Sequence, residues 1–128
     1  MDIPRVRLVR QTAPQPRVAD IAAEVRRQWL TSKTAARVRP GMRVAVACGS
    51  RGIQNYLTLA RATVAALREL GAQPFVVAAM GSHGGATPHG QRELLAGYQI
   101  DEAHLGVPVV TDMEAVRVGT NSWGQPVW

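Results

Sequence analysis

Two short apolar segments of this chain each run into the same kind of glycine-containing turn. Residues 44–48 lead into Gly49-Ser50-Arg51-Gly52, and residues 75–79 lead into Gly81-Ser82-His83-Gly84, 32 residues later. Apolar runs without alternation are typical of strands covered on both faces, as in a parallel sheet. Repeated strand and turn units followed by helical patterns constrain the fold strongly, because they are how α/β proteins are built.

The segment between the two turns has the periodicity of a helix. Apolar residues recur at spacings of three and four from about Asn55, and Gly71 is in place to end the helix in a left-handed cap. Strand, helix and strand within about thirty residues form a βαβ unit, whose crossover is nearly always right-handed. The two strands are therefore expected to be parallel.

The flanking segments predict shorter elements. Thr87 and Pro88 are a good N-cap and first position for a third helix ending near Tyr98. We also expect a half-exposed strand over residues 5–9, an amphipathic helix over 18–30, and short strands at 109–111, at 115–118 and from 126 onward. The sequence thus predicts an α/β fold with a three-layer, mainly parallel sheet, in one domain over residues 1–128.

A net charge of +6 and a sequence pI near 11.0 raise the question of nucleic-acid binding. The excess is almost entirely arginine, scattered from Arg5 to Arg117, with Lys33 as the single lysine. Aromatic residues, on which bases would stack, make up 5% of the chain. We therefore expect a solvated, arginine-rich surface and no nucleic-acid partner.

Cellular location can be approached through cysteine content and hydropathy. Cys48 is the one cysteine, so an internal disulfide framework is excluded and a reducing compartment is the default. No apolar run reaches the roughly 18 residues that span a bilayer. We expect a cytoplasmic protein without a membrane partner. The sequence is compatible with a homo-oligomer. Because the chain ends on apolar Trp128, we also expect it to be truncated at the C-terminus.

The two turns carry the residues best suited to chemistry. Turns at the carboxyl ends of parallel strands share one edge of the sheet, where ligands bind, so Arg51 and His83 are expected to face one crevice. A histidine can give and take a proton at neutral pH, and an arginine can hold a carboxylate or phosphate in two parallel bonds. We expect His83 to be catalytic, and Arg51, Ser50 and Ser82 to bind substrate.

Each of these residues also has an ordinary structural interpretation. Small residues are common in tight turns, a histidine can bridge loop backbone, and an arginine in a turn is often simply exposed. Helix N-termini favour anions, so we expect Gly84, Gly85 and Thr87 to contact a cofactor, although neither turn is a recognised phosphate-binding motif. The spacing of the three histidines does not match a metal site, and no metal ligand is predicted.

The stretches around both turns resemble the amino-terminal domain of the nickel-pincer-dependent lactate racemase family. The resemblance is carried by Cys48-Gly49-Ser50-Arg51-Gly52-Ile53 and by the longer stretch PFVVAAMGSHGGAT, residues 74–87. Gly90-Gln91, Glu93-Leu94-Leu95, Gly106-Val107-Pro108-Val109 and Asp112-Met113-Glu114 fit as well. The resemblance covers nearly the whole chain.

The resemblance implies a racemase or epimerase of 2-hydroxy acids that uses a nickel-pincer nucleotide. In that family the cofactor accepts a hydride from the α-carbon while a histidine takes the hydroxyl proton. His83 matches such an acid/base histidine, and Arg51 matches a substrate-binding arginine. Lactate racemases carry an aspartate and a proline around that arginine, so Gly-Ser-Arg-Gly-Ile here indicates the broader group of homologues.

The family's second acid/base histidine, its cofactor-tethering lysine and its nickel-ligating histidine lie beyond the matched region. The isolated chain is therefore expected to be inactive, and to act as an isomerase only when completed by the missing region. The alternative is a non-catalytic α/β module that binds an anion or nucleotide at its glycine-rich turns.

Overall fold

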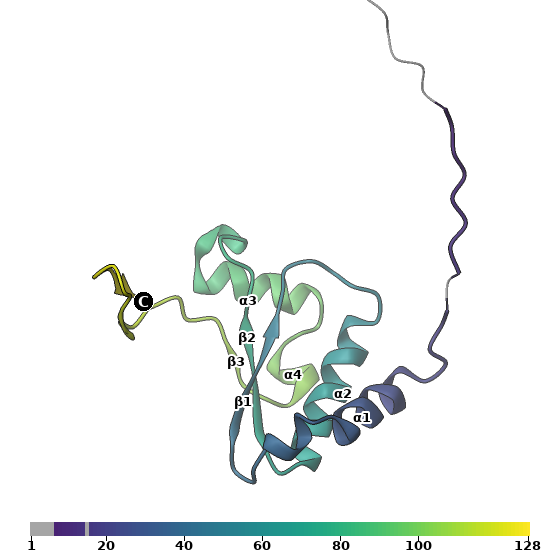
Figure 1. The fold of residues 1–128 in the computed structure, drawn as a ribbon, viewed down its shortest axis with the longest axis horizontal. Helices are drawn as coiled ribbons and strands as arrows, with labels where there is room; N and C mark the ends of the chain where they lie inside the picture. The colour runs from purple at the N-terminus through teal and green to yellow at the C-terminus, as the bar shows by residue number, and fades with distance from the viewer. Residues whose placement is uncertain (1–6, 15) are drawn as a thin grey trace, which may run out of the picture.

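The computed structural model describes residues 7–14 and 16–128 (Figure 1). Helices and strands alternate through most of this range, as the βαβ pattern predicted. In chain order the elements are α1 (Ile21–Thr31), the 3₁₀ turn η1 (Ala35–Arg37), β1 (Arg43–Cys48), α2 (Tyr56–Glu69), β2 (Gln73–Ala78), the 3₁₀ turn η2 (Gly84–Ala86), α3 (Pro88–Gly97), α4 (Glu102–Leu105), β3 (Val109–Val110), β4 (Gly119–Thr120) and β5 (Pro126–Val127).

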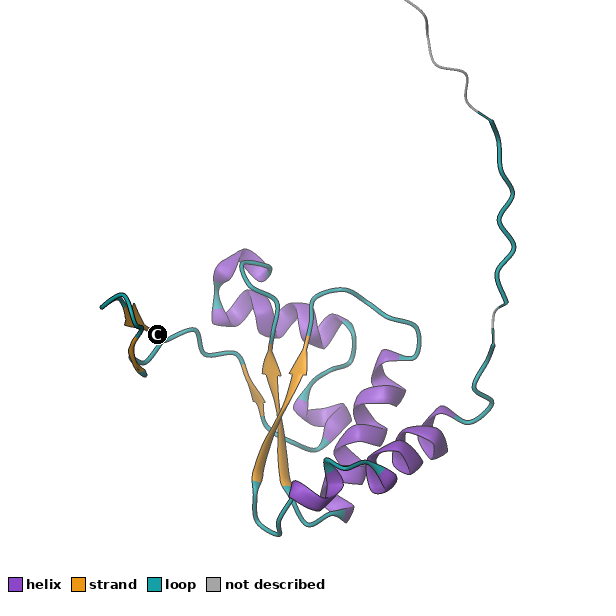
Figure 2. Cartoon of the chain, viewed as in Figure 1, coloured by secondary structure: helices purple, strands orange, loops and turns teal. Residues whose placement is uncertain are grey.

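The central sheet has three strands in the order β1-β2-β3, and both pairings are parallel. Ala45 lies opposite Phe75, and Val77 lies opposite Val110. Figure 2 shows β1 and β2 pointing the same way, so that the turns that follow them emerge at one end of the sheet. The predicted α/β class, the βαβ unit and the parallel sheet are confirmed.

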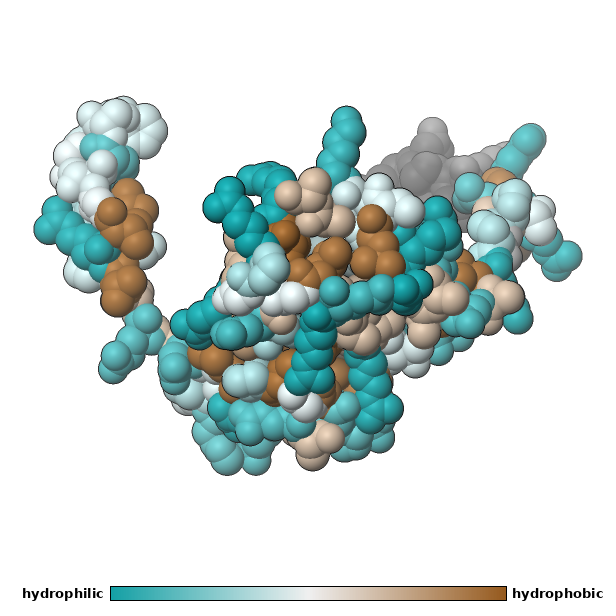
Figure 3. All heavy atoms as spheres, turned by 90° about the horizontal axis from the view of Figure 1, so that it is seen from below, coloured by the Kyte–Doolittle hydropathy of each residue, from teal (hydrophilic) through white to brown (hydrophobic). Residues whose placement is uncertain are grey.

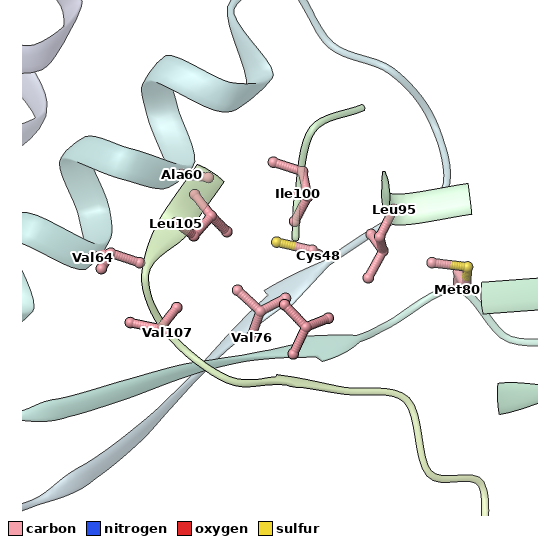
Figure 4. Packing of buried hydrophobic residues seen from close by; sticks show 10 residues of the cluster. Cys48, Ala60, Val64, Val76, Met80, Leu95, Ile100, Leu105 and Val107 are labelled. Atoms are coloured by element: carbon pink, nitrogen blue, oxygen red, sulfur yellow. The ribbon is translucent and has the colours of Figure 1, made fainter. Parts of the chain in front are cut away.

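The core lies between one face of the sheet and the helices. One cluster of buried residues combines side chains of all three strands with side chains of α2, α3 and α4, which places these helices on the same face (Figure 4). Val76, at the centre of β2, is 0% exposed. The cluster comprises Cys48, Ala60, Val64, Val76, Met80, Leu95, Ile100, Leu105, Val107 and Val109.

The expected third layer is not found in the part of the chain that the structure describes. Along β1 the side chains alternate in burial, and Ala45 and Ala47 are exposed. On the same face Phe75 and Val77 are half-buried, and the guanidinium of Arg43 lies 4.9 Å from the centre of the Phe75 ring. The apolar run misled the sequence analysis because small alanines tolerate exposure, so their hydropathy does not reveal which face is covered.

The helix ends follow the expected local chemistry. Thr87 accepts a hydrogen bond from the backbone N–H of Gly90 at 3.1 Å, and Pro88 takes the first helical position of α3. Gly71, after α2, has a φ of +82°, which fits the predicted left-handed cap. Asp20, which the sequence analysis did not identify, caps α1 by accepting from Ala23 N at 2.9 Å.

Three arginines bind backbone carbonyl groups in the stretch that runs from α4 into β3. Arg61 donates to His104 O at 2.9 Å, Arg68 to Gly106 O at 2.5 Å, and Arg92 to Val109 O at 2.7 Å. These bonds join α2 and α3 to the segment that leads into the third strand. Part of the arginine excess therefore has an internal structural role.

Both ends of the described chain lie outside the core. Residues 7–10 are exposed and form no strand, contrary to the prediction, and the other two residues of that predicted strand lie outside the described residues. Residues 115–118 also form no strand, contrary to the prediction, whereas the pairing strand predicted from Pro126 is confirmed as β5, antiparallel to β4. Figure 3 shows this C-terminal hairpin standing apart from the body. No described helix has the length and apolar character to cross a membrane.

Candidate functional site

The two glycine-containing turns meet at the carboxyl ends of β1 and β2. The Ser50 hydroxyl of the first turn hydrogen-bonds to Nδ1 of His83 in the second. The backbone also joins the turns, because Ala79 N donates to Cys48 O at 2.8 Å. The repeated turns predicted at one sheet edge therefore do lie together, at the edge where α/β proteins bind their ligands.

Two tyrosines hold the first turn in place. Tyr56, at the start of α2, donates to Gly49 O at 3.2 Å, and Tyr98, just after α3, donates to Ser50 O at 3.1 Å. Their ring centres lie 5.8 Å apart, and a Cβ at Gly52 would stand 2.8 Å from the Tyr98 ring. The glycine at this position lets the ring pack directly on the turn, which is held at Gly49 O from α2 and at Ser50 O from the end of α3.

The Cys48 thiol and the Tyr56 hydroxyl, next to the first turn, are kept neutral by their surroundings. Burial raises the pKa of the Cys48 thiol above its ordinary value. Burial, together with the neighbouring Cys48, also raises the pKa of the Tyr56 hydroxyl. Tyr56 therefore stays protonated and remains a hydrogen-bond donor to the turn.

A buried amide and a glycine pair hold the second turn. Gln91, 4% exposed, donates from Nε2 to Gly81 O at 2.7 Å and to His83 O at 3.3 Å. Gly84 has a φ of +66° and lies against the backbone of Gly90, so that a Cβ on Gly90 would stand 2.0 Å from Gly84 O. Both glycines are required for the loop to pass this closely over the first turn of α3.

The predicted catalytic and substrate-binding residues lie on the outside of this paired turn. His83, Arg51 and Ser82 are exposed, and Ser50 is half-buried. The Ser50 side chain hydrogen-bonds to the His83 ring, and Arg51 is the next residue in the chain after Ser50. No hydrogen bond or ion pair joins its guanidinium to another described residue, so the arginine is not used in holding the described part of the chain together.

The residues expected to contact a cofactor are partly engaged within the chain. Thr87 caps α3, and its hydroxyl also donates to Gly84 O at 3.1 Å. Gly84 is covered by Gly90, whereas a Cβ at Gly85 would meet nothing within 4 Å. The close approach allowed by Gly84 is thus made by the chain's own backbone.

Sequence reasoning missed the three side chains that support the site. Tyr56 falls within the helix predicted from about Asn55 and was given no separate role, and neither were Tyr98 and Gln91. The spacing from Thr87 to Gln91 held a usable signal, because the position one turn after an N-cap faces back toward the preceding loop. Tyr98 and Ser50 are 48 residues apart in the sequence, so no local sequence pattern predicts their hydrogen bond.

The other histidines have local partners. His89 lies 3.3 Å from Glu93 on the exposed face of α3, and His104 contacts the Asp101 carboxylate at 2.8 Å. Within residues 7–14 and 16–128 there is no group of three or more His, Cys, Asp or Glu side chains that could hold a metal ion.

A separate groove of about 620 Å³ lies between the segment before α1, α1 itself and the start of α2. None of the predicted site residues lines it. Its lining residues are Pro16, Arg17, Val18, Ile21, Glu24, Val25, Gln54, Asn55 and Leu59.

Comparisons with family models, with curated proteins and with solved structures found no match to this chain. The exposed imidazole of His83 can exchange a proton with a ligand hydroxyl, and the guanidinium of Arg51, on the adjoining turn and free of described partners, can hold a carboxylate.

Proposed function

We propose that this chain forms the amino-terminal half of the active site of a nickel-pincer-nucleotide-dependent racemase or epimerase of 2-hydroxy acids. In this proposal Arg51 binds the substrate carboxylate and Nε2 of His83 exchanges a proton with the substrate hydroxyl. The observation that carries the proposal is the hydrogen bond between Ser50 and His83, because it joins the two turns from which both side chains extend.

The chemistry of a 2-hydroxy acid suits this pair. Its carboxylate and hydroxyl oxygens lie on adjacent carbon atoms, so both must be bound by protein groups that are close together. A guanidinium offers parallel N–H donors to the carboxylate, and an imidazole nitrogen can accept the hydroxyl proton and return it. Ser82, exposed beside His83, is assigned to the same substrate surface.

The resemblance to the lactate racemase family supplies the cofactor part of the proposal. When bound, the nickel-pincer nucleotide would supply the hydride acceptor that carbon inversion needs. The described residues do not themselves fit a nickel site, since they contain no suitable cluster of ligands. The proposal therefore limits this chain to binding the substrate carboxylate and moving the hydroxyl proton. Of the glycines expected to contact the cofactor, Gly85 is the one at which an added Cβ would meet nothing within 4 Å.

The experiment that tests the proposal is a ligand-observed saturation-transfer measurement on the chain. D-lactate and L-lactate should both bind weakly, because a half-site contacts either enantiomer through the same carboxylate and hydroxyl. Arg51→Gln should abolish the transfer, and His83→Gln should reduce it. The control Arg39→Gln removes an exposed arginine near the amino end of β1 and should leave the transfer unchanged.

The same measurement with adenosine monophosphate separates the proposal from its alternative. Binding of the nucleotide with no transfer to either lactate would favour a non-catalytic module that holds anions at its glycine turns. Lactate binding that survives Arg51→Gln would also contradict the proposed role of the arginine.

A further inference from the structure

Side chains from elsewhere in the fold anchor the backbone of both Ser50 and His83. Tyr98 supports the Ser50 carbonyl at 3.1 Å, and Gln91 supports the His83 carbonyl at 3.3 Å. The exposed imidazole is thus bound at Nδ1 by a neighbour whose own backbone is anchored. Nε2, on the opposite side of the ring, has no hydrogen bond to a described residue and is the nitrogen available to a ligand.

We infer that Ser50 is a positioning residue for His83: its Oγ accepts the Nδ1–H, and this leaves Nε2 unprotonated and able to take the substrate's hydroxyl proton. The inference rests on the proposed function, in which His83 acts first as a base. When a neutral imidazole donates its Nδ1–H to a hydroxyl oxygen, Nε2 is the nitrogen left without a proton. Ser50 thereby acts on His83, in addition to the direct substrate contact expected from the sequence.

A serine suits this position better than a carboxylate would. Its oxygen accepts an N–H without carrying a negative charge, whereas an adjacent carboxylate favours the charged imidazolium. The imidazolium already holds the proton that the base has to receive. A neutral acceptor therefore keeps His83 able both to take and to return a proton, as inversion in both directions requires.

Ser82 provides a matched control from the second turn. It occupies the position corresponding to Ser50, and its carbonyl accepts from Ala86 N at 3.0 Å. Its exposed hydroxyl has no hydrogen bond to a described residue. Removing that hydroxyl should therefore not alter the protonation of the His83 ring.

The test is a ¹⁵N-edited NMR measurement of the histidine ring nitrogens in the ligand-free chain, at about pH 8 where imidazoles are neutral. His83 should show a protonated Nδ1 and an unprotonated Nε2, with its signals assigned by their absence in His83→Gln. Ser50→Ala should lose this preference, and Ser50→Thr, which keeps the hydroxyl, should restore it. Ser82→Ala should match the wild type.

Two results would overturn the inference. One is a wild-type spectrum in which the His83 proton resides on Nε2, a result that needs no variant to fold. The other is a Ser50→Ala spectrum identical to that of the wild type. Because no ligand is present, this outcome is independent of lactate binding, so failure of the proposed function and failure of this inference are distinguishable.

Discussion

Gly84 and Gly90 are in direct backbone contact, and this contact sets the course of the loop that carries His83. A Cβ on Gly90 would lie 2.0 Å from the carbonyl oxygen of Gly84, and a Cβ on Gly84 would lie 2.5 Å from the carbonyl carbon of Gly90. Neither position can accept a side chain without movement of the loop away from α3. The histidine turn is therefore shaped by its own chain before any ligand binds.

The first prediction concerns this contact. Gly90→Ala should lower the free energy of unfolding by about 1–3 kcal/mol, because the added methyl group forces the backbone apart. Urea unfolding measures the change. Gly97→Ala, in the same helix with nothing within 4 Å of the added Cβ, should be neutral or stabilising by up to about 1 kcal/mol. Equal effects at the two positions would contradict the described packing.

The second prediction tests the two-layer arrangement with adjacent residues of β2. Val76 faces the helices and is fully buried, whereas Val77 lies half-buried on the face that no described helix covers. Val76→Thr should cost about 1–3 kcal/mol, since it buries a hydroxyl without a partner. Val77→Thr should cost well under about 1 kcal/mol. Similar losses from both variants in urea unfolding would show that a further layer covers the second face.

The third prediction is a pH dependence at Asp101. The backbone N–H of His104, followed by its side chain, lowers the pKa of the Asp101 carboxyl below its ordinary value. A group with a lowered folded-state pKa contributes stability above its unfolded pKa, and this is lost as the pH falls through the folded value. Asp101→Asn keeps the capping oxygen but loses the charge, so the variant should melt below the wild type near neutral pH, with the difference vanishing on acidification.

Thermal melts of both proteins between about pH 7 and pH 2 measure this difference. Asp112→Asn, an exposed position with no described hydrogen bond, serves as the control and should show no convergence with the wild type. A gap between wild type and Asp101→Asn that persisted unchanged at low pH would contradict the assignment.

The repeated apolar runs and the turn residues were enough to predict the central elements. Thr87 and Pro88 predicted the start of α3, and Gly71 predicted the end of α2. The position of both turns at one edge of the sheet followed from the parallel arrangement of the strands. These features could be predicted because each depends on a short stretch of sequence with a definite local preference.

The features that were missed depend on contacts between distant residues. The open face of the sheet could not be recognised from the sequence. Ala45 and Ala47 lie on that face, and the hydropathy of alanine does not tell whether a helix covers it. The bond from Tyr98 to Ser50 and the arginine bonds to carbonyl groups each form only after the chain has folded. The contact between Gly84 and Gly90 likewise forms only in the folded chain, and the expected cofactor contact of Gly84 stays a prediction.

The measurement that tests the central claim most directly is protein-observed NMR of the Arg51 side chain and the His83 ring during titration with lactate and, separately, propionate. The two acids share the carboxylate and differ by the hydroxyl. Lactate should shift both Arg51 Nε–H and His83 Nε2, and propionate should shift Arg51 alone. Equal responses of His83 to both acids, or no response of Arg51 to either, would contradict the claim that these two turns bind a single 2-hydroxy acid.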